Sequence, residues 1–151
     1  MRAIKSRDTS PERIVRAALR VIAPGYRLHK RGLPGRPDIV YGARKIAVFV
    51  HGCFWHGHDC AHGSRVPKTN REFWIAKITR NRARDARDLA ALKALGWRVL
   101  VLWECGLRDG PSTRARLRAF LGPPPVLRRY ERTGVSPAPR RLSDRRDAAS
   151  K

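Results

Sequence analysis

Lys45-Ile46-Ala47-Val48-Phe49-Val50 is the stretch that decides the fold, because it is an apolar run rich in β-branched residues, the pattern of a β-strand. Two shorter extended segments precede it, over residues 26–30 and 37–41, and turn residues separate all three. Residues 97–103, ending in Trp103, have the composition of a further, buried strand. The sequence therefore predicts four strands, of which the first three follow one another closely along the chain.

Helices are expected before, between and after these strands. Residues 10–22 begin with Ser10-Pro11-Glu12, which reads as an N-cap serine, a proline at the first helical position and an acidic first turn. The expected core face of this helix consists of four residues: Ile14, Ala18, Leu19 and Ile22. Residues 69–72 match a capping box that opens a long helix, which Gly96 closes, and a last helix covers about residues 112–121.

The order αβββαβα indicates an α/β chain of the α+β type. The last strand returns to the sheet through a helical crossover, so the sheet is expected to be mixed. A chain of 151 residues with 42% hydrophobic residues builds one core, which we place in residues 1–122. Residues 123–151 hold five of the 11 prolines and eight of the 34 basic residues, and we expect a disordered basic tail there.

The charge indicates a polyanionic partner. The net charge is +22, and residues 1–122 alone carry 26 basic and nine acidic residues. This balance favours nucleic acid over an anionic membrane without selecting an activity. No apolar stretch reaches the length of a membrane span, and the polar N-terminus resembles no signal peptide, so a cytoplasmic location is expected. Three cysteines are an odd number, which disfavours a disulfide framework and leaves metal binding or simple burial.

Every cysteine of the chain belongs to one candidate metal set, Cys53, His58, Cys60 and Cys105. Three thiolates and one imidazole are a ligand set that closes a tetrahedral structural zinc site. Such a site would pin the long loop over residues 51–68 to the edge of the sheet. The alternative is that the three thiols are buried as small hydrophobic side chains.

A second candidate site combines Asp38, at the start of a strand, with His51 and His56, which follow the next strand. A carboxylate in such a place can hold Mg²⁺ near a scissile phosphate, and a histidine can take a proton from water. Alternatives remain for both residue types. Asp38 follows Pro37, as a turn residue commonly does, and one of the histidines could bind zinc in place of His58 or simply cap a loop.

The long helix also carries a basic row with steps of three and four residues: Lys77, Arg80, Arg84 and Arg87. This row either contacts DNA phosphates or is an ordinary solvated face.

Four segments together resemble the very short patch repair endonucleases, over about residues 1–107 in unbroken order. They are Leu33-Pro34-Gly35-Arg36-Pro37-Asp38, Val50-His51-Gly52-Cys53-Phe54-Trp55-His56, Glu72-Phe73-Trp74 and the stretch from Gly96-Trp97-Arg98-Val99-Leu100 to Trp103-Glu104-Cys105. The resemblance implies a restriction-endonuclease-like core whose usual acid-x-lysine element is replaced by Phe49-Val50-His51. It also implies a Mg²⁺-dependent enzyme that nicks one strand of double-stranded DNA beside a T:G mismatch, acting as a monomer alongside other mismatch-repair proteins.

Roles follow from the resemblance position by position. Asp38 and the backbone carbonyl of Val50 resemble the magnesium ligands, and His56 resembles the histidine that activates water. Glu12 and His51 resemble the groups that hold the water around the metal. The zinc ligands match the four residues named above, and an aromatic wedge inserted beside the mismatch is matched by Phe54, Trp55 and Trp74.

Two features depart from the family pattern. Val50 stands where relatives commonly have threonine, which preserves a backbone ligand and removes a hydroxyl group. In relatives a further short segment that contacts DNA precedes the motif that opens this chain, Met1-Arg2-Ala3-Ile4. We expect Trp97 and Trp103, by contrast with the wedge, to pack in the core.

Two other functions compete with mismatch nicking. One is a zinc-stabilised nucleic-acid-binding module without catalysis, for which the basic residues would suffice. The other is a related sequence-specific restriction endonuclease, which would cut both strands of an intact duplex. The pairing of Asp38 with His56 argues against a pure binding module, because binding alone needs no such pair.

Overall fold

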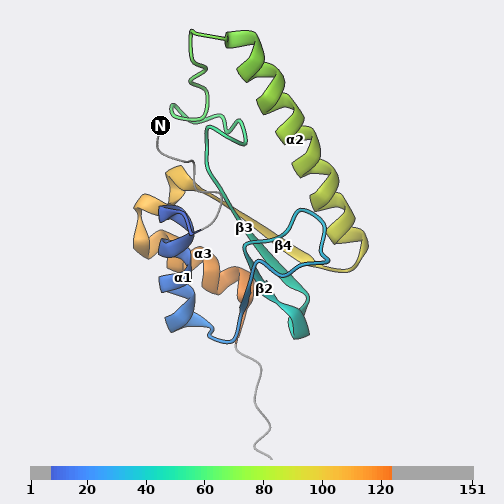
Figure 1. Ribbon diagram of the computed structural model, residues 1–151. Coiled ribbons are helices and arrows are strands. Elements are labelled where there is room, and N and C mark those ends of the chain that lie inside the picture. The colour runs from blue at the N-terminus through green and yellow to red at the C-terminus, as the bar shows by residue number, and fades with distance from the viewer. Residues whose placement is uncertain (1–7, 124–151) are drawn as a thin grey trace, which may run out of the picture.

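The computed structural model describes residues 8–123 and contains one four-stranded mixed sheet (Figure 1). Its strands stand in the order β1 (Arg27–Leu28), β2 (Ile39–Tyr41), β3 (Ile46–His51) and β4 (Arg98–Trp103). The first three strands pair antiparallel, and β4 pairs parallel with β3. The predicted element order and the mixed sheet are confirmed.

Strand β3 is the centre of the sheet, and all six of its residues are buried. Alternate side chains serve two cores, because successive residues of a strand point to opposite faces. Ile46, Val48 and Val50 belong to the larger core, and Ala47 and Phe49 belong to the smaller one. This burial on both faces explains why residues 46–50 form a continuous apolar run.

The helices cover the two faces of the sheet unequally (Figure 1). α1 (Ser10–Ile22) and α3 (Gly110–Leu121) pack together over the larger core, while α2 (Arg71–Ala94) contributes Leu92 to the smaller one. Only the C-terminal part of α2 lies against the sheet, and its N-terminal part extends toward the loop over residues 52–70 (Figure 1).

The N-terminus of α1 differs from the sequence prediction. Its N-cap is Thr9 and not Ser10, and the Thr9 hydroxyl accepts a hydrogen bond from the Glu12 N–H. Three of the four predicted core residues pack in the larger core, since Leu19 is fully buried and Ala18 and Ile22 are half-buried. Ile14 is 46% exposed, and Val15 is buried in its place. Glu12 therefore lies on the inner side of the helix, with only 4% of its surface exposed.

The start of α2 also differs. Asn70 occupies the N-cap in a left-handed conformation and makes no side-chain cap, so the expected capping box is not formed. The sequence places Ile75 and Ala86 near one face of this helix together with Ile78, Leu89 and Leu92, which predicts a core face. Ile75 and Ala86 are exposed because this part of the helix stands away from the sheet. The end at Gly96 is confirmed, with φ of +78° that suits glycine.

Two further points concern the ends of the chain. Helix α3 starts at Gly110, two residues earlier than predicted, because Asp109 caps it through a bond from the Ser112 N–H. Nearly all of the proposed tail lies outside the described residues, and the domain boundary at residue 122 stays a prediction. No helix within residues 8–123 is long and apolar enough to cross a membrane.

Candidate active site and metal centre

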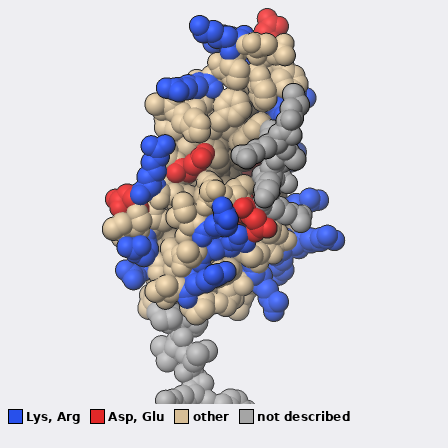
Figure 2. Space-filling model, turned by 60° about the vertical axis from the view of Figure 1, so that its left-hand side comes forward, with Lys and Arg blue, Asp and Glu red and all other residues tan. Residues whose placement is uncertain are grey.

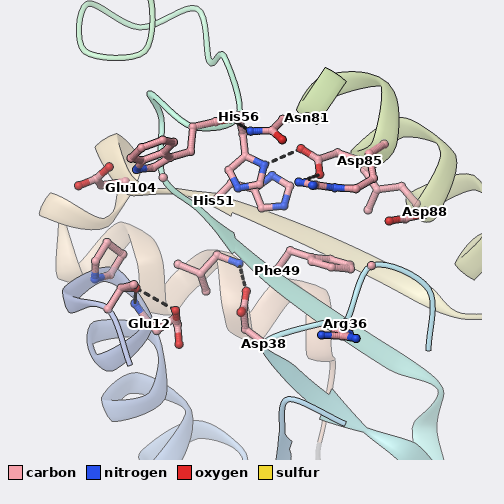
Figure 3. Close-up of a pocket in the computed structure, with 18 of the residues that line it drawn as sticks. Glu12, Arg36, Asp38, Phe49, His51, His56, Asn81, Asp85, Asp88 and Glu104 are labelled. Carbon is pink, nitrogen blue, oxygen red and sulfur yellow. Dashed lines mark hydrogen bonds and ion pairs between the residues drawn. The ribbon is translucent and has the colours of Figure 1, made fainter. Parts of the chain in front are cut away.

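A cavity of about 900 Å³ lies where α1, the end of β3 and α2 meet (Figure 3). Its lining is rich in carboxylates and includes five of the nine acidic residues among residues 8–123: Glu12, Asp38, Asp85, Asp88 and Glu104. This concentration contrasts with the surface around it, where Lys and Arg side chains outnumber acidic ones (Figure 2). Carboxylates in such a cavity repel phosphate unless cations compensate their charge.

Two of these carboxylates lie on the side of the cavity formed by α1 and β2 (Figure 3). Asp38, directly before β2, accepts a hydrogen bond of 2.7 Å from the Val50 N–H through Oδ2. Burial, together with the nearby charge of Glu12, raises the pKa of Asp38 to about 6 against the opposing hydrogen bond from the Val50 N–H. A carboxyl group with a raised pKa in a cavity is typical of functional sites.

Two histidines and an aspartate form the opposite side of the cavity (Figure 3). The rings of His51 and His56 stack with centroids 3.8 Å apart and an interplanar angle of 5°. His56 Nδ1 lies 2.5 Å from Asp85 Oδ2 on α2. Burial, followed by the charge of His56, lowers the pKa of His51 to about 4, so His51 is neutral near pH 7. An imidazole oriented by a carboxylate is an arrangement suited to general base catalysis.

A separate cluster brings together the four residues of the predicted metal set. The ligand atoms of Cys53, His58, Cys60 and Cys105 all lie within 4.8 Å of one another. His58 Nδ1 faces Cys105 Sγ at 3.5 Å, and the backbone N–H of Cys105 donates to Cys53 Sγ. The alternative of three separately buried thiols is not what the structure shows, because only Cys53 is buried.

The thiols of this cluster differ in acidity. A hydrogen bond with His58, aided by the Gly63 N–H, lowers the pKa of Cys60 to about 6. Burial raises the pKa of Cys53 to about 12, which disfavours three thiolates in one place without a compensating cation. The donor set therefore fits a bound metal ion.

Trp103 links the two sites and was wrongly expected in the core. Its ring stacks on His58 at 4.3 Å and meets His51 edge-on at 5.2 Å, so it forms a layer between the Cys/His cluster and the cavity. The parallel register that pairs His51 with Trp103 puts both at the same end of the sheet. Trp97 does pack on the smaller core, as expected.

The three predicted wedge aromatics lie together, and one of them, Trp55, lines the cavity. The ring centroids of Phe54, Trp55 and Trp74 are separated by 5.1 to 6.0 Å. Lys77 lies over Trp55 and Trp74 at 5.4 and 5.5 Å, and Asn81 donates to the Trp55 carbonyl. An aromatic cluster that is only half-buried at the mouth of a cavity offers a surface on which bases can stack.

The basic row on α2 is divided by its surroundings. Lys77 sits among the aromatic rings, Arg84 approaches Asp85 at 3.7 Å, and Arg87 pairs with Asp88 at 3.1 Å. Arg80 is exposed and forms no ion pair within the described part of the chain. The four side chains therefore lie on one helix but have different neighbours.

Sequence reasoning missed four residues of these sites, namely His29, Asn81, Asp85 and Glu104. Asp85 carries a weak signal, because it is an acidic residue within an arginine-rich helix and one turn after Asn81. Glu104 receives a hydrogen bond from the Cys53 N–H and stands directly before the cluster residue Cys105. His29 is the one histidine outside the loop over residues 51–68.

Comparison with known proteins identifies a family. Residues 1–62 match the family model described as DNA mismatch endonuclease Vsr. The chain is 50% identical over 123 residues to the Type II nicking enzyme V.XorIIP of Xanthomonas oryzae pv. oryzae, covering 82% of this chain and 90% of that protein. It is 47% identical over 108 residues to the DNA mismatch endonuclease Vsr of Escherichia coli, covering 72% and 69%.

A third relative points the same way. The Type II nicking enzyme V.NmeAIP of Neisseria meningitidis is 43% identical over 121 residues, covering 80% of this chain and 86% of that protein. These relatives set aside the binding module without catalysis, because they are named as endonucleases and nicking enzymes. The chain belongs to the Vsr family of DNA mismatch endonucleases and is a nuclease that nicks DNA strands.

Proposed function

We propose that this enzyme nicks one strand of double-stranded DNA beside a T:G mismatch, in very short patch repair, using Mg²⁺ at Asp38. We further propose that Cys53, His58, Cys60 and Cys105 hold a structural zinc ion. The observation that carries the proposal is one cavity that combines the carboxylates of Glu12 and Asp38, the His56–Asp85 pair and Trp55, on which the other two wedge aromatics pack. We also propose a restriction-endonuclease-like core, because the candidate catalytic residues Asp38, directly before β2, and His51, at the end of β3, belong to neighbouring strands of a mixed sheet.

Asp38 and the backbone carbonyl of Val50 would hold the divalent cation, and Glu12 and His51 would contact its water shell. When bound, the cation supplies charge stabilisation to the phosphate and acidifies water. His56 accepts a proton from the attacking water, and Asp85 fixes the ring through Nδ1 so that the other ring nitrogen is available to the water. The oxygen of that water forms a bond to phosphorus as the bond to the leaving oxygen breaks.

Zinc is proposed for the Cys/His cluster because thiolate and imidazole donors prefer it to Mg²⁺, which binds oxygen ligands. Gly63 N–H donates to Cys60 Sγ at 3.3 Å, and the Cys105 N–H donates to Cys53 Sγ at 3.4 Å. Such backbone donors stabilise negative charge on the sulfurs that would bind the metal. Trp103 stacks on His58 of this cluster and contacts His51 of the cavity. A zinc ion in the cluster would therefore also stabilise this wall of the active site.

Mismatch preference is expected to depend on the aromatic cluster. Trp55→Ala should lower affinity for a T:G duplex by about 10- to 100-fold, since stacking of one base on an aromatic ring contributes about 1–3 kcal/mol. Affinity for the matched duplex should change far less, because intact base steps resist unstacking. Competition binding with both duplexes measures the ratio.

A matched tryptophan variant separates this role from packing. Trp97→Phe alters a core tryptophan and should lower the melting temperature while leaving the T:G preference unchanged. With 2-aminopurine beside the mismatch, the native enzyme should brighten the probe and the Phe54→Ala, Trp55→Ala double variant should not. A double variant that brightens the probe and keeps the native preference would place recognition elsewhere.

Phosphate contacts from α2 are tested by salt dependence. Arg80→Gln should lower the slope of log affinity against log salt by about 0.9, the value for one released counterion. The same change at Lys77, Arg84 or Arg87 is expected to act alike if each contacts a phosphate, with a smaller effect where an acidic neighbour already shares the charge. Arg118→Gln on α3 is the control of equal charge, and unchanged slopes in all four α2 variants would make the row ordinary surface.

A further inference from the structure

His29 follows β1 and places its ring between the two carboxylates of the cavity wall. Its Nε2 lies 3.7 Å from Glu12 Oε2, and its Nδ1 lies 3.9 Å from Asp38 Oδ1. The backbone holds it there, because the His29 N–H donates to the Asp38 carbonyl at 3.1 Å. One imidazole thus faces both acidic residues, with one ring nitrogen toward each.

Two features of His29 are unfavourable in a purely structural residue. Its φ is +45°, in the left-handed region that residues other than glycine seldom occupy. Its Nε2 is buried and has no hydrogen-bond partner within the described part of the chain. Buried polar atoms without partners are rare, and together with backbone strain they indicate a functional constraint.

The other contacts of the carboxylates show what His29 adds. The two carboxylate oxygens of Asp38 have different neighbours: Oδ2 accepts a hydrogen bond from the Val50 N–H, and Oδ1 faces His29. Glu12 receives hydrogen bonds from the Thr9 hydroxyl and from the Asp8 N–H, both on the side of the α1 N-terminus. His29 is therefore the side chain that spans from one acidic residue to the other.

We propose that His29 is a positioning residue that fixes the separation and orientation of the Glu12 and Asp38 carboxylates toward the divalent cation. The inference rests on the proposed function, in which Asp38 is the cation ligand. Side chains that orient the ligands of a metal are as important as the ligands themselves, and their loss lowers metal affinity by about 10- to 100-fold. His29 contacts neither the substrate nor the reacting atoms in this role.

The test measures cation binding apart from activity, with Mn²⁺ titrated into the DNA-free protein and followed by electron paramagnetic resonance. His29→Ala should weaken Mn²⁺ binding by about 10- to 100-fold and raise the Mg²⁺ concentration for half-maximal nicking by a similar factor. Nicking at saturating Mg²⁺ and affinity for mismatched DNA without metal should stay within about threefold of native. This split separates positioning from a general loss of structure.

Three variants complete the test. His29→Gln retains a side-chain N–H and should restore Mn²⁺ binding to within about threefold, whereas His29→Phe retains a ring without N–H and should behave like His29→Ala. Lys30→Ala, in the exposed neighbouring residue, should bind Mn²⁺ as the native enzyme does. Thermal melting identifies any variant that fails to fold. Among the folded variants, the difference in Mn²⁺ binding between His29→Gln and His29→Phe then shows whether the side-chain N–H of His29 is what supports cation binding.

Mn²⁺ binding by Asp38→Ala separates the role of His29 from the role of Asp38 as the cation ligand. If Asp38→Ala loses Mn²⁺ binding while His29→Ala and His29→Phe bind it as the native enzyme does, the role of His29 is overturned and Asp38 remains the ligand. If Asp38→Ala binds Mn²⁺ and nicks normally, the proposed function is wrong and the role of His29 is overturned with it.

Discussion

His56→Ala is expected to lower the rate of nicking by about 10²- to 10⁴-fold, the contribution of a general base, and Asp38→Ala by at least as much. The reason is that His56 is the histidine held by Asp85, and Asp38 is the half-buried carboxylate that accepts a hydrogen bond from the β3 backbone at Val50. Affinity for a T:G duplex without Mg²⁺ should remain close to native in both variants. Single-turnover nicking and fluorescence anisotropy measure the two quantities separately.

Graded variants around the same site sharpen this prediction. His51→Ala and Glu12→Gln should reduce nicking less, because we propose that both groups act through the water around the cation. The nicking rate of Asp85→Asn should lie between that of His56→Ala and those of the His51 and Glu12 variants, since the amide keeps a polar partner for His56 and loses the charge. Asp59→Asn, an exposed carboxylate near the Cys/His cluster, is the matched control. Near-native nicking by Asp38→Ala would move the cation site to another residue.

Removal of the metal from the Cys/His cluster is expected to unfold the loop over residues 52–70 and to abolish nicking. The native chain should contain one tightly held zinc ion, and Cys105→Ala should lose both the zinc and the cooperative thermal transition. Binding energy at a structural zinc site is folding energy, and this loop has few buried apolar residues to replace it. Elemental analysis and thermal melting before and after chelation provide the measurement.

A control histidine from the same loop tests the ligand set. His62 is exposed and lies outside the cluster, so His62→Ala should keep zinc and stability while His58→Ala loses both. Re-addition of Mg²⁺ after chelation should not restore the fold, because the cluster has no oxygen ligands. Folded, fully reduced protein without any metal would show that the four residues are only packed together.

The strands and the four residues that gather in the Cys/His cluster could be predicted from the sequence, because these depend on local pattern and residue type. The run over residues 46–50 is apolar throughout because both faces of β3 are buried. The Cys/His set follows from the chain having few such residues and from Cys105 standing directly after the last strand. Neither inference needs the relative orientation of distant segments.

The errors arise where three-dimensional packing decides between similar neighbours. Ile14 and Val15 are both apolar, and only the docking of α1 on the sheet makes Val15 the buried one. Ile75 and Ala86 follow the helical period, yet the part of α2 that carries them lies away from the sheet. Trp103 was assigned to the core on composition, whereas the strand register puts it against His51 and His58.

The missed site residues have no local signature. Asp85 lies 29 positions after its partner His56, and charge on a helical surface is ordinarily a solvated face. His29 acquires its meaning only when the pairing of β1 with β2 brings it beside Asp38 and the capped start of α1 brings Glu12 to the same place. Such arrangements depend on contacts between distant segments and require the folded structure.

The central claim is tested most directly by nicking of duplexes in which each strand carries its own fluorescent label. The substrates are a pool with a single T:G pair flanked by randomised base pairs, and a pool of identical design with a T:A pair at that position. With Mg²⁺ present, we predict a nick in one strand beside the T:G pair, intact complementary strands, and an uncut T:A pool. Cleavage of both strands, or equal cleavage of the two pools, would contradict the assignment as a mismatch-directed nicking enzyme.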